Sequence, residues 1–252
     1  MRKILIIGVL FLILSSCATK KEILYLQDSA DYDNTALTYS IPKIQPNDIL
    51  KIEVGALIEE SALPYNKSNG SIGGQSIELM QLEGYIVSQN HTINYPVLGL
   101  VSTENMTINE LEERIKKMLV DGGHLKAPTV NIRLVNAKVT ILGEVNSPGV
   151  YNFTEQNISL LQALGYASDL TINGKREDIK LIRESDGNRT ITHIDLTSAE
   201  FLNSEFNQIR PNDIIIVDPN GPKVKSAGFV GNTATFISVI SILLTTVVLI
   251  TR

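Results

Sequence analysis

The sequence predicts an α+β protein with two small mixed domains and a C-terminal transmembrane helix. Short segments that alternate apolar and polar residues, such as ILKIEV at 49–54, predict half-buried strands. Helix-start signals stand between these segments, as in Thr107-Ile108-Asn109-Glu110. Near the C-terminus, residues 229–250 contain no charged residue. Strands and helices therefore share each domain, and an apolar helix follows them.

Composition limits the classes of function. The chain has 252 residues and a formal net charge of −5, and its length is sufficient for two modest domains. A mildly acidic chain without a Lys/Arg cluster is poorly suited to nucleic acid, so we expect no nucleic-acid partner. Cys17 is the only cysteine, so no disulfide can form within the chain and each core must be held by burial.

The N-terminus has the order of a secretory signal peptide. Arg2 and Lys3 precede an apolar run at 4–14, and small residues then lead to Cys17. A small-residue cleavage site followed directly by cysteine resembles a bacterial lipobox. The resemblance implies a signal peptide at 1–16, a diacylglycerol on Cys17 and a lipidated tether at 17–40. The alternative is a buried thiol in an ordinary membrane anchor, but the apolar run is too short to span ~30 Å as a helix.

The first predicted domain covers residues 41–136. Thr107 and Glu110 have the spacing of a capping box, and the apolar residues at 108–119 fall on one face of a helix. Residues 64–76 have the composition of a loop. Strands are predicted at 49–54, 85–87, 93–98 and 128–134.

The second predicted domain covers residues 137–220. A short helix is expected from Ser159 to Leu164, ending at Gly165, and a second capping box is expected at 197–200. Residues 219–225, rich in Pro, Gly and Lys, are expected to form a linker. Strands are predicted at 138–143, 149–153, 179–183, 189–194 and within 209–217.

One turn sequence occurs in both domains. IQPNDIL at 44–50 and IRPNDII at 209–215 share Pro-Asn-Asp ahead of an apolar strand. Asn and Asp side chains bond to nearby backbone and favour turns, so each domain should use this turn to begin a strand. The match is too short to indicate a duplication. Asp48 and Asp213 are therefore interpreted as turn-capping residues and not as a catalytic pair.

The C-terminal apolar segment, residues 229–250, is expected to form a transmembrane helix about 33 Å long. Small and hydroxyl residues recur along it at helical spacing. In a membrane helix such a stripe marks a face for helix packing or for water. The alternative is a lone anchor whose hydroxyls bond to carbonyls one turn earlier. The stripe consists of Gly231, Ala234, Ser238, Ser241 and Thr245.

No catalytic pattern is present in the sequence. His91, His124 and His193 are far apart and lack the spacing of metal ligands. Neither a phosphate-binding P-loop nor a nucleophile elbow occurs. We therefore expect no enzyme activity, no metal site and no cofactor. The chain also has no Trp, which argues weakly against a lectin that binds glycans tightly.

Several segments together resemble a known family. They are IQPNDILKIEV at 44–54, 95–119, VTILGEVNSPGVY at 139–151, 158–171 and IRPNDIIIVDPN at 209–220. In this order they resemble the polysaccharide export family of outer-membrane lipoproteins, which exports capsule and exopolysaccharide. The second domain is similar to that family's soluble-ligand-binding β-grasp domain. The chain departs from the best-known members by having one such domain and by having Tyr166 after Gly165.

The resemblance implies a function without catalysis. It implies a homo-oligomeric ring in the outer membrane, with soluble domains in the periplasm, through which polysaccharide passes. The implied partners are the polysaccharide, membrane lipid and an inner-membrane polysaccharide co-polymerase that regulates chain length. The alternatives are a monomeric periplasmic glycan-binding lipoprotein and a scaffold of the same pathway without a pore.

Overall fold

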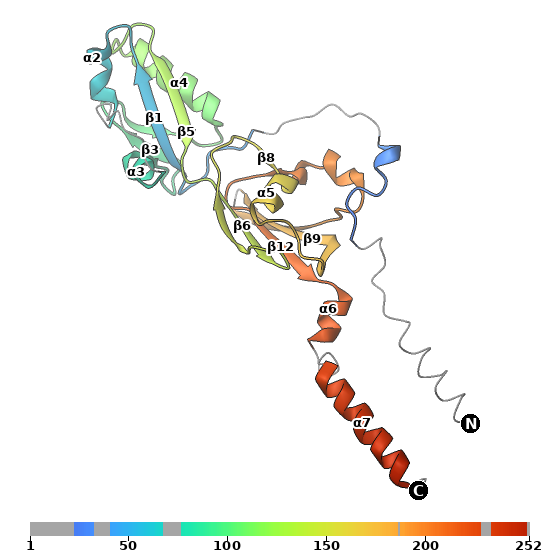
Figure 1. Cartoon of the computed structure of the whole chain (residues 1–252). Coiled ribbons are helices and arrows are strands. Elements are labelled where there is room, and N and C mark those ends of the chain that lie inside the picture. The colour runs from blue at the N-terminus through green and yellow to red at the C-terminus, as the bar shows by residue number, and fades with distance from the viewer. Residues whose placement is uncertain (1–22, 33–40, 68–76, 186, 228–232, 251–252) are drawn as a thin grey trace.

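The computed structural model describes residues 23–32, 41–67, 77–185, 187–227 and 233–250. The predicted signal peptide and Cys17 lie outside these residues. Figure 1 shows two lobes, with the C-terminal helices leading away from the second lobe. Each lobe has its own cluster of buried apolar side chains. Strands and helices are mixed in both, so the α+β part of the predicted fold class agrees with the structure.

The first domain is built on a three-stranded antiparallel sheet. Its central strand β1 (Ile49–Gly55) lies between β2 (Tyr85–Ile86) and β5 (Thr129–Leu134). Helix α4 (Ile108–Asp121) packs on β5. The alternation predicted for β1 is confirmed, because its burial alternates along the strand. Strand β5 is an edge strand, which leaves one side of it facing the second domain.

Helix α4 begins with the predicted capping box. The backbone N–H of Glu110 donates to Thr107 Oγ1 at 3.3 Å, and the backbone N–H of Thr107 donates to Glu110 Oε2 at 2.7 Å. Both amides would otherwise lack a partner in the first turn. Leu111, Ile115 and Leu119 are buried on the face that packs against the sheet.

The region between β1 and α4 differs from the prediction. The strand expected at 93–98 is instead a hairpin of β3 (Thr92–Tyr95) and β4 (Gly99–Ser102). The chain reverses there because Val97 and Gly99 have φ values of 65° and 71°, a region that only Gly adopts without cost. Short helices that were not predicted precede the hairpin: α2 (Glu59–Ala62), η3 (Leu63–Tyr65) and α3 (Ile77–Glu83).

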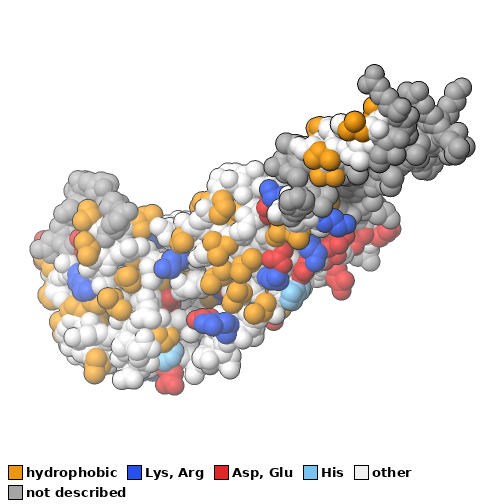
Figure 2. All heavy atoms as spheres, turned by 90° about the horizontal axis from the view of Figure 1, so that it is seen from below, with side chains coloured by type: hydrophobic (Ala, Val, Ile, Leu, Met, Phe, Trp, Pro, Cys, Tyr) orange, Lys and Arg blue, Asp and Glu red, His pale blue; other side chains and the backbone are white. Residues whose placement is uncertain are grey.

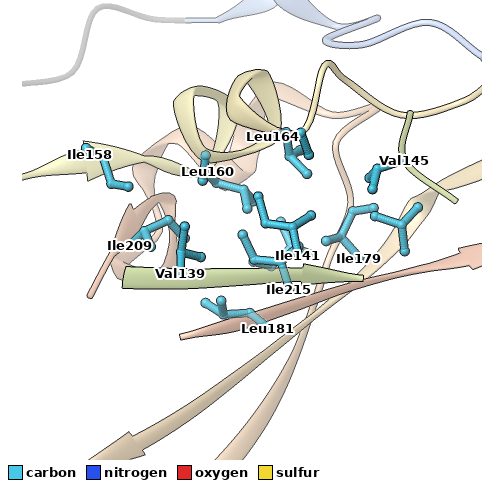
Figure 3. Close-up of a cluster of buried hydrophobic side chains, with 14 of the residues drawn as sticks. Val139, Ile141, Val145, Ile158, Leu160, Leu164, Ile179, Leu181, Ile209 and Ile215 are labelled. Carbon is cyan, nitrogen blue, oxygen red and sulfur yellow. The ribbon is translucent and has the colours of Figure 1, made fainter. Parts of the chain in front are cut away.

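The second domain contains a five-stranded sheet in the order β10-β9-β12-β6-β7. Strands β12 and β6 are parallel and the other neighbours are antiparallel. Helix α5 (Leu160–Tyr166) lies over one face, where Leu160 and Leu164 meet Ile141 and Ile215 in the core (Figure 3). The sheet strands are β6 (Lys138–Gly143), β7 (Gly149–Asn152), β9 (Gly174–Ser185), β10 (Asn188–Ile194) and β12 (Ile214–Pro219).

Two helix predictions in this domain need correction. Helix α5 does not end at Gly165 but continues to Tyr166, and the chain turns only where Ser168 and Asp169 adopt positive φ. At 197–200 there is no capping box. Ser198 alone caps the short 3-10 helix η4 (Ala199–Asn203), because Thr197 bonds to Asp195 instead. Helix η5 (Glu205–Asn207) and the pair β8 (Ile158–Ser159) and β11 (Gln208–Ile209) complete the domain.

The segment before the first domain packs on the second one. The backbone N–H groups of Leu26 and Gln27 donate to the carbonyls of Leu196 and Thr197 at 3.1 and 2.7 Å. Within the predicted tether, residues 23–32 are thus docked, and they include η2 (Ser29–Asp31). Asp28 accepts hydrogen bonds from the Ser198 hydroxyl and the Ala199 amide at 2.7 and 2.5 Å.

Tyr25 fixes this segment further. Its hydroxyl donates to Asp169 Oδ1 at 2.5 Å, and the Arg176 guanidinium lies 5.2 Å from the centre of its ring. Burial raises the pKa of Tyr25, and the Asp169 carboxylate raises it further. The sequence did not indicate this docking, because its partners lie more than a hundred residues away along the chain.

The C-terminal predictions are wrong in two respects. Residues 219–225 are not a plain linker, because Asn220 caps the short helix α6 (Gly221–Ser226). The predicted transmembrane helix is also contradicted: within the described part of the chain, no helix combines the length and apolarity needed to cross a membrane. Helix α7 (Thr233–Ile250) has 18 residues, which is about 27 Å against a hydrocarbon core of ~30 Å.

Candidate functional site at the domain junction

The two domains meet around the short connection after β5. The side chain of Leu134 packs against both hydrophobic cores. Asn136, in this connection, bonds to the Pro-Asn-Asp turn that precedes β1. Its side-chain amide donates to the carbonyl of Asn47 and accepts from the N–H of Ile49, both at 2.9 Å. The N–H of Val135 donates to the Ile49 carbonyl at 2.9 Å. The junction is therefore held by specific contacts.

A cleft follows this junction and consists of two adjoining hollows. The smaller, about 220 Å³, lies between the two Pro-Asn-Asp turns and is lined by Gln45, Asp48, Arg210 and Asn212 among others. The larger, about 440 Å³, lies between the start of α4, strand β5 and the loop after β7. The hollows share the lining residues Ile41, Pro42, Ile108, Leu134 and Pro211.

The larger hollow combines an apolar floor with a polar rim. Ile108 and Leu134 are half-buried and Phe153 is buried in its floor. The rim carries Glu112, whose carboxylate accepts a hydrogen bond from the backbone N–H of Ile132 at 2.7 Å. Several amide side chains also face the hollow, and none was singled out by the sequence. They include Asn109, Asn131, Gln156 and Asn157.

The two Pro-Asn-Asp turns have the same geometry. Asp48 Oδ2 accepts from the N–H of Gln45 at 2.8 Å, and Asp213 Oδ2 accepts from the N–H of Arg210 at 2.8 Å. Asn47 and Asn212 both adopt positive φ, 71° and 68°. Both aspartates are buried. The expectation that they cap turns is consistent with these hydrogen bonds.

Only the second turn has a cation beside its carboxylate. Arg183 donates through Nε and Nη2 to the two oxygens of Asp213, at 3.0 and 2.7 Å. Burial raises the pKa of Asp213, and the Arg183 guanidinium opposes that rise. Burial also raises the pKa of Asp48, to about 6, and the hydrogen bond from Gln45 opposes this only in part. Asp48 is therefore a buried carboxyl group of the cleft whose pKa is raised toward neutral pH.

None of the predicted site residues that the structure describes lines this cleft. Cys17 and Gly231 lie outside the described residues, and for Ala234 only the backbone is described. Ser238, Ser241 and Thr245 are exposed on α7. The Thr245 and Thr246 hydroxyls donate to the carbonyls of Ser241 and Ile242, at 2.7 and 2.8 Å. The stripe as a packing face stays a prediction.

The histidines likewise form no common site. His193 Nδ1 lies 2.5 Å from Asp178 Oδ1, and Lys175 donates to the other oxygen of that carboxylate at 2.8 Å. The hydrogen bond from Lys175, followed by that from His193, lowers the pKa of Asp178 to about 2. Among the described residues no group of His, Cys, Asp and Glu could hold a metal ion.

Comparisons with known proteins place these domains in a family. Residues 38–135 match the family described as polysaccharide biosynthesis/export protein, and residues 137–217 match the SLBB domain. Two relatives carry the name EPS I polysaccharide export outer membrane protein EpsA. The one from Ralstonia solanacearum is 24% identical over 140 residues, covering 54% of this chain and 36% of the relative. The one from Ralstonia nicotianae is 28% identical over 106 residues, 40% of this chain and 27% of the relative.

This chain thus spans about a third of the length of these relatives. The matched families and the named relatives are export proteins and not enzymes. The two matches follow each other along the chain and correspond to the two lobes on either side of the cleft. By these matches the chain belongs to the polysaccharide export family.

Proposed function

We propose that this chain is an outer-membrane component that exports polysaccharide as a homo-oligomeric ring. Its soluble domains would lie in the periplasm, and a diacylglycerol on Cys17 would anchor each copy. The family match and the names of both relatives, which include "outer membrane", support the role and the location. No bond is made or broken in this function; the ring guides a polymer that is synthesised elsewhere.

The observation that carries the proposal is the docking of the N-terminal segment. Leu26 and Gln27 bond to the second domain, and α6 leaves that same domain directly after β12. In Figure 1 both described ends lie on the side of the second lobe, while the first lobe extends away. A lipid at Cys17 would therefore hold the second domain near the membrane. The first domain would then point into the periplasm, where an inner-membrane co-polymerase could meet it.

The outer face of the second sheet supports assembly. Strand β12 contains the unbroken apolar run Ile214–Val217, a pattern typical of strands covered on both faces. Helix α5 covers only one face, and on the other Leu142, Val150 and Ile191 are 43, 60 and 58% exposed. Figure 2 shows hydrophobic side chains across this side of the molecule with charged groups at the margins. Neighbouring copies in a ring would cover such a face.

The C-terminal helix would add to the same assembly. Ile237, Ile242 and Leu249 on α7 are 63, 66 and 73% exposed in the single chain. We place the stripe of Ser238, Ser241 and Thr245 at contacts between the α7 helices of neighbouring copies. Small and hydroxyl residues allow helix backbones to approach closely.

Deletion of the gene tests the export role. Cells that lack the chain should stop displaying polysaccharide on their surface, and the wild-type gene should restore it. Complementation with Cys17→Ser should fail, and the variant should take up no radioactive fatty acid. Normal surface polysaccharide in the deletion strain would contradict the export function.

Sedimentation of the full-length chain in mild detergent tests the ring. We expect an oligomer that dissociates when residues 228–252 are removed, with both soluble domains still folded. A monomer would contradict the conduit and would favour the glycan-binding lipoprotein. An inner-membrane location after fractionation would instead favour a scaffold of the pathway.

A further inference from the structure

The larger hollow of the junction cleft has the features of a ligand site. It measures about 440 Å³ and is lined by residues of both domains. Such a size, with apolar walls and a few convergent polar groups, is typical of small-ligand sites. We propose that this hollow is a saccharide-binding subsite that holds a short stretch of the exported chain, an inference that rests on the proposed export function.

The unused polar side chains of the hollow point to a sugar. Within the described parts of the chain, the side chains of Asn109, Asn131 and Asn157 bond to no other residue, nor does the guanidinium of Arg133. An amide side chain both donates and accepts hydrogen bonds. A sugar hydroxyl does the same, so neighbouring amides can bind neighbouring hydroxyls. Arg133 adds planar donors suited to an acidic sugar's carboxylate.

The floor of the hollow suits the apolar side of a sugar ring. Pro42, Ile108 and Leu134 line it from the first domain and the connection. Phe153 comes from the second domain but is only 5% exposed, so it offers no aromatic face for stacking. Binding should therefore be weak, with a dissociation constant on the order of 1 mM. Weak binding suits a polymer that must move on.

A protein strand is a poorer occupant of the hollow. Strand β5 is an edge strand, and an open edge can pair with an added strand. Here the outward N–H of Ile132 is already bonded to the Glu112 carboxylate at 2.7 Å. A strand added at this edge would have to displace that carboxylate. The free amides favour a hydroxyl-rich ligand instead.

The test uses the full-length chain in mild detergent. The probe is a set of short oligosaccharides obtained by partial hydrolysis of the exopolysaccharide that the source strain secretes. Binding is measured by saturation-transfer NMR for wild type, for the double variant Asn131→Leu/Asn157→Leu and for a control. The control is Asn94→Leu, which changes an exposed strand amide of the first domain outside the cleft.

We expect the double variant to bind about tenfold more weakly than wild type, because it loses hydrogen bonds to sugar hydroxyls. The control should bind as wild type does. Equal binding by all three proteins would overturn the proposal, because the sugar would then bind elsewhere. If the double variant unfolds, Arg133→Gln provides the same comparison with a single exposed change, and unchanged binding by it to every fragment would count against the site.

A cysteine introduced at Asn131 tests for a protein occupant. Crosslinking of this cysteine to a second copy in intact cells would overturn the saccharide proposal. The deletion strain separates the subsite from the export function. If export is lost on deletion but wild type binds no fragment, the subsite is wrong and the export role stands. If fragments bind but deletion leaves export normal, the export role is wrong.

Discussion

The turn before β1 and the turn before β12 have the same backbone but different surroundings. Each aspartate accepts the amide three residues earlier at 2.8 Å, and each asparagine has a positive φ. In the second turn Arg183 neutralises Asp213, whereas in the first turn Asn136 bonds to the backbone and brings no charge. A local sequence therefore fixes the turn, while distant residues decide how its buried carboxylate is compensated.

The largest expected effect comes from removing the cation that pairs with Asp213 in the turn before β12. Arg183→Met leaves Asp213 as a buried carboxylate without its cation, and Asp213 is only 1% exposed. Removing one partner of a buried ion pair costs about 3–5 kcal/mol. We expect that loss in the free energy of unfolding, measured by urea titration of the full-length chain at pH 7.

The matched control removes both charges. Arg183→Met combined with Asp213→Asn keeps an oxygen that can accept the Arg210 amide, so most of the lost stability should return. A double variant as unstable as Arg183→Met would show that the guanidinium acts through its bond to the Gln208 carbonyl or its contact with Phe206 instead.

The first turn, which has no cation beside Asp48, should respond in the opposite direction: removing its carboxylate charge should stabilise the fold at high pH. The pKa of Asp48 is raised from 3.8 to about 6 in the folded chain, a difference worth about 3 kcal/mol. Between pH 3.8 and about 6, Asp48 is therefore protonated in the folded state and ionised in the unfolded state. This contribution to stability is complete below pH 3.8 and is lost as the pH rises to about 6.

Asp48→Asn should remove that pH dependence and make the protein more stable at pH 8. The measurement is the difference in unfolding free energy between wild type and variant from pH 4 to pH 8. A difference that does not change with pH would mean that Asp48 titrates at an ordinary value. Asp213→Asn serves as the comparison, and it should destabilise at pH 8 because Arg183 loses its partner.

Asn136→Ala tests how much the first turn depends on the side chain that bonds to its backbone. It leaves the Ile49 N–H and the Asn47 carbonyl without their side-chain partner. We expect a loss of about 2 kcal/mol in the free energy of unfolding. Asn94→Ala, an exposed amide on β3, should cost far less. Equal losses for the two variants would show that the turn does not depend on Asn136.

The smallest expected effect concerns the shared feature of the turns. Asn47→Ala and Asn212→Ala each keep a β-carbon at positive φ but remove the short amide side chain that stabilises this conformation locally, at a cost of about 1 kcal/mol. The two losses should be equal, since the backbone geometry is the same. Replacement by glycine at either position should be nearly neutral. Unequal losses would show that the surroundings act on the backbone as well as on the carboxylate.

The parts of the fold that depend on near neighbours were predictable. Alternation indicated β1, β5 and β6, and the spacing of Thr107 and Glu110 indicated the start of α4. The hairpin after β3 was missed because a positive φ at Val97 is unusual for a β-branched residue. Sequence patterns give the preferred conformation, and here the hairpin contacts of β4 override it.

The candidate site could hardly be predicted. Asn109 and Asn157 lie in different domains, and neither has a spacing that suggests a ligand. Arg183 and Asp213 are 30 residues apart in the chain, so nothing in either local sequence shows the pair. The prediction of a transmembrane helix was made from the apolar composition of residues 229–250 alone, whereas the described helix α7 has 18 residues.

The docking of residues 23–32 has a mechanical consequence. The second domain binds the N-terminal segment through Leu26 and Gln27, and the chain leaves the same domain through α6. A pulling force applied between the segment before residue 23 and helix α6 therefore runs through the second domain alone. The first domain does not lie between the two points where that force acts on the second domain. The strain between the two ends of the chain therefore does not pass through the first domain.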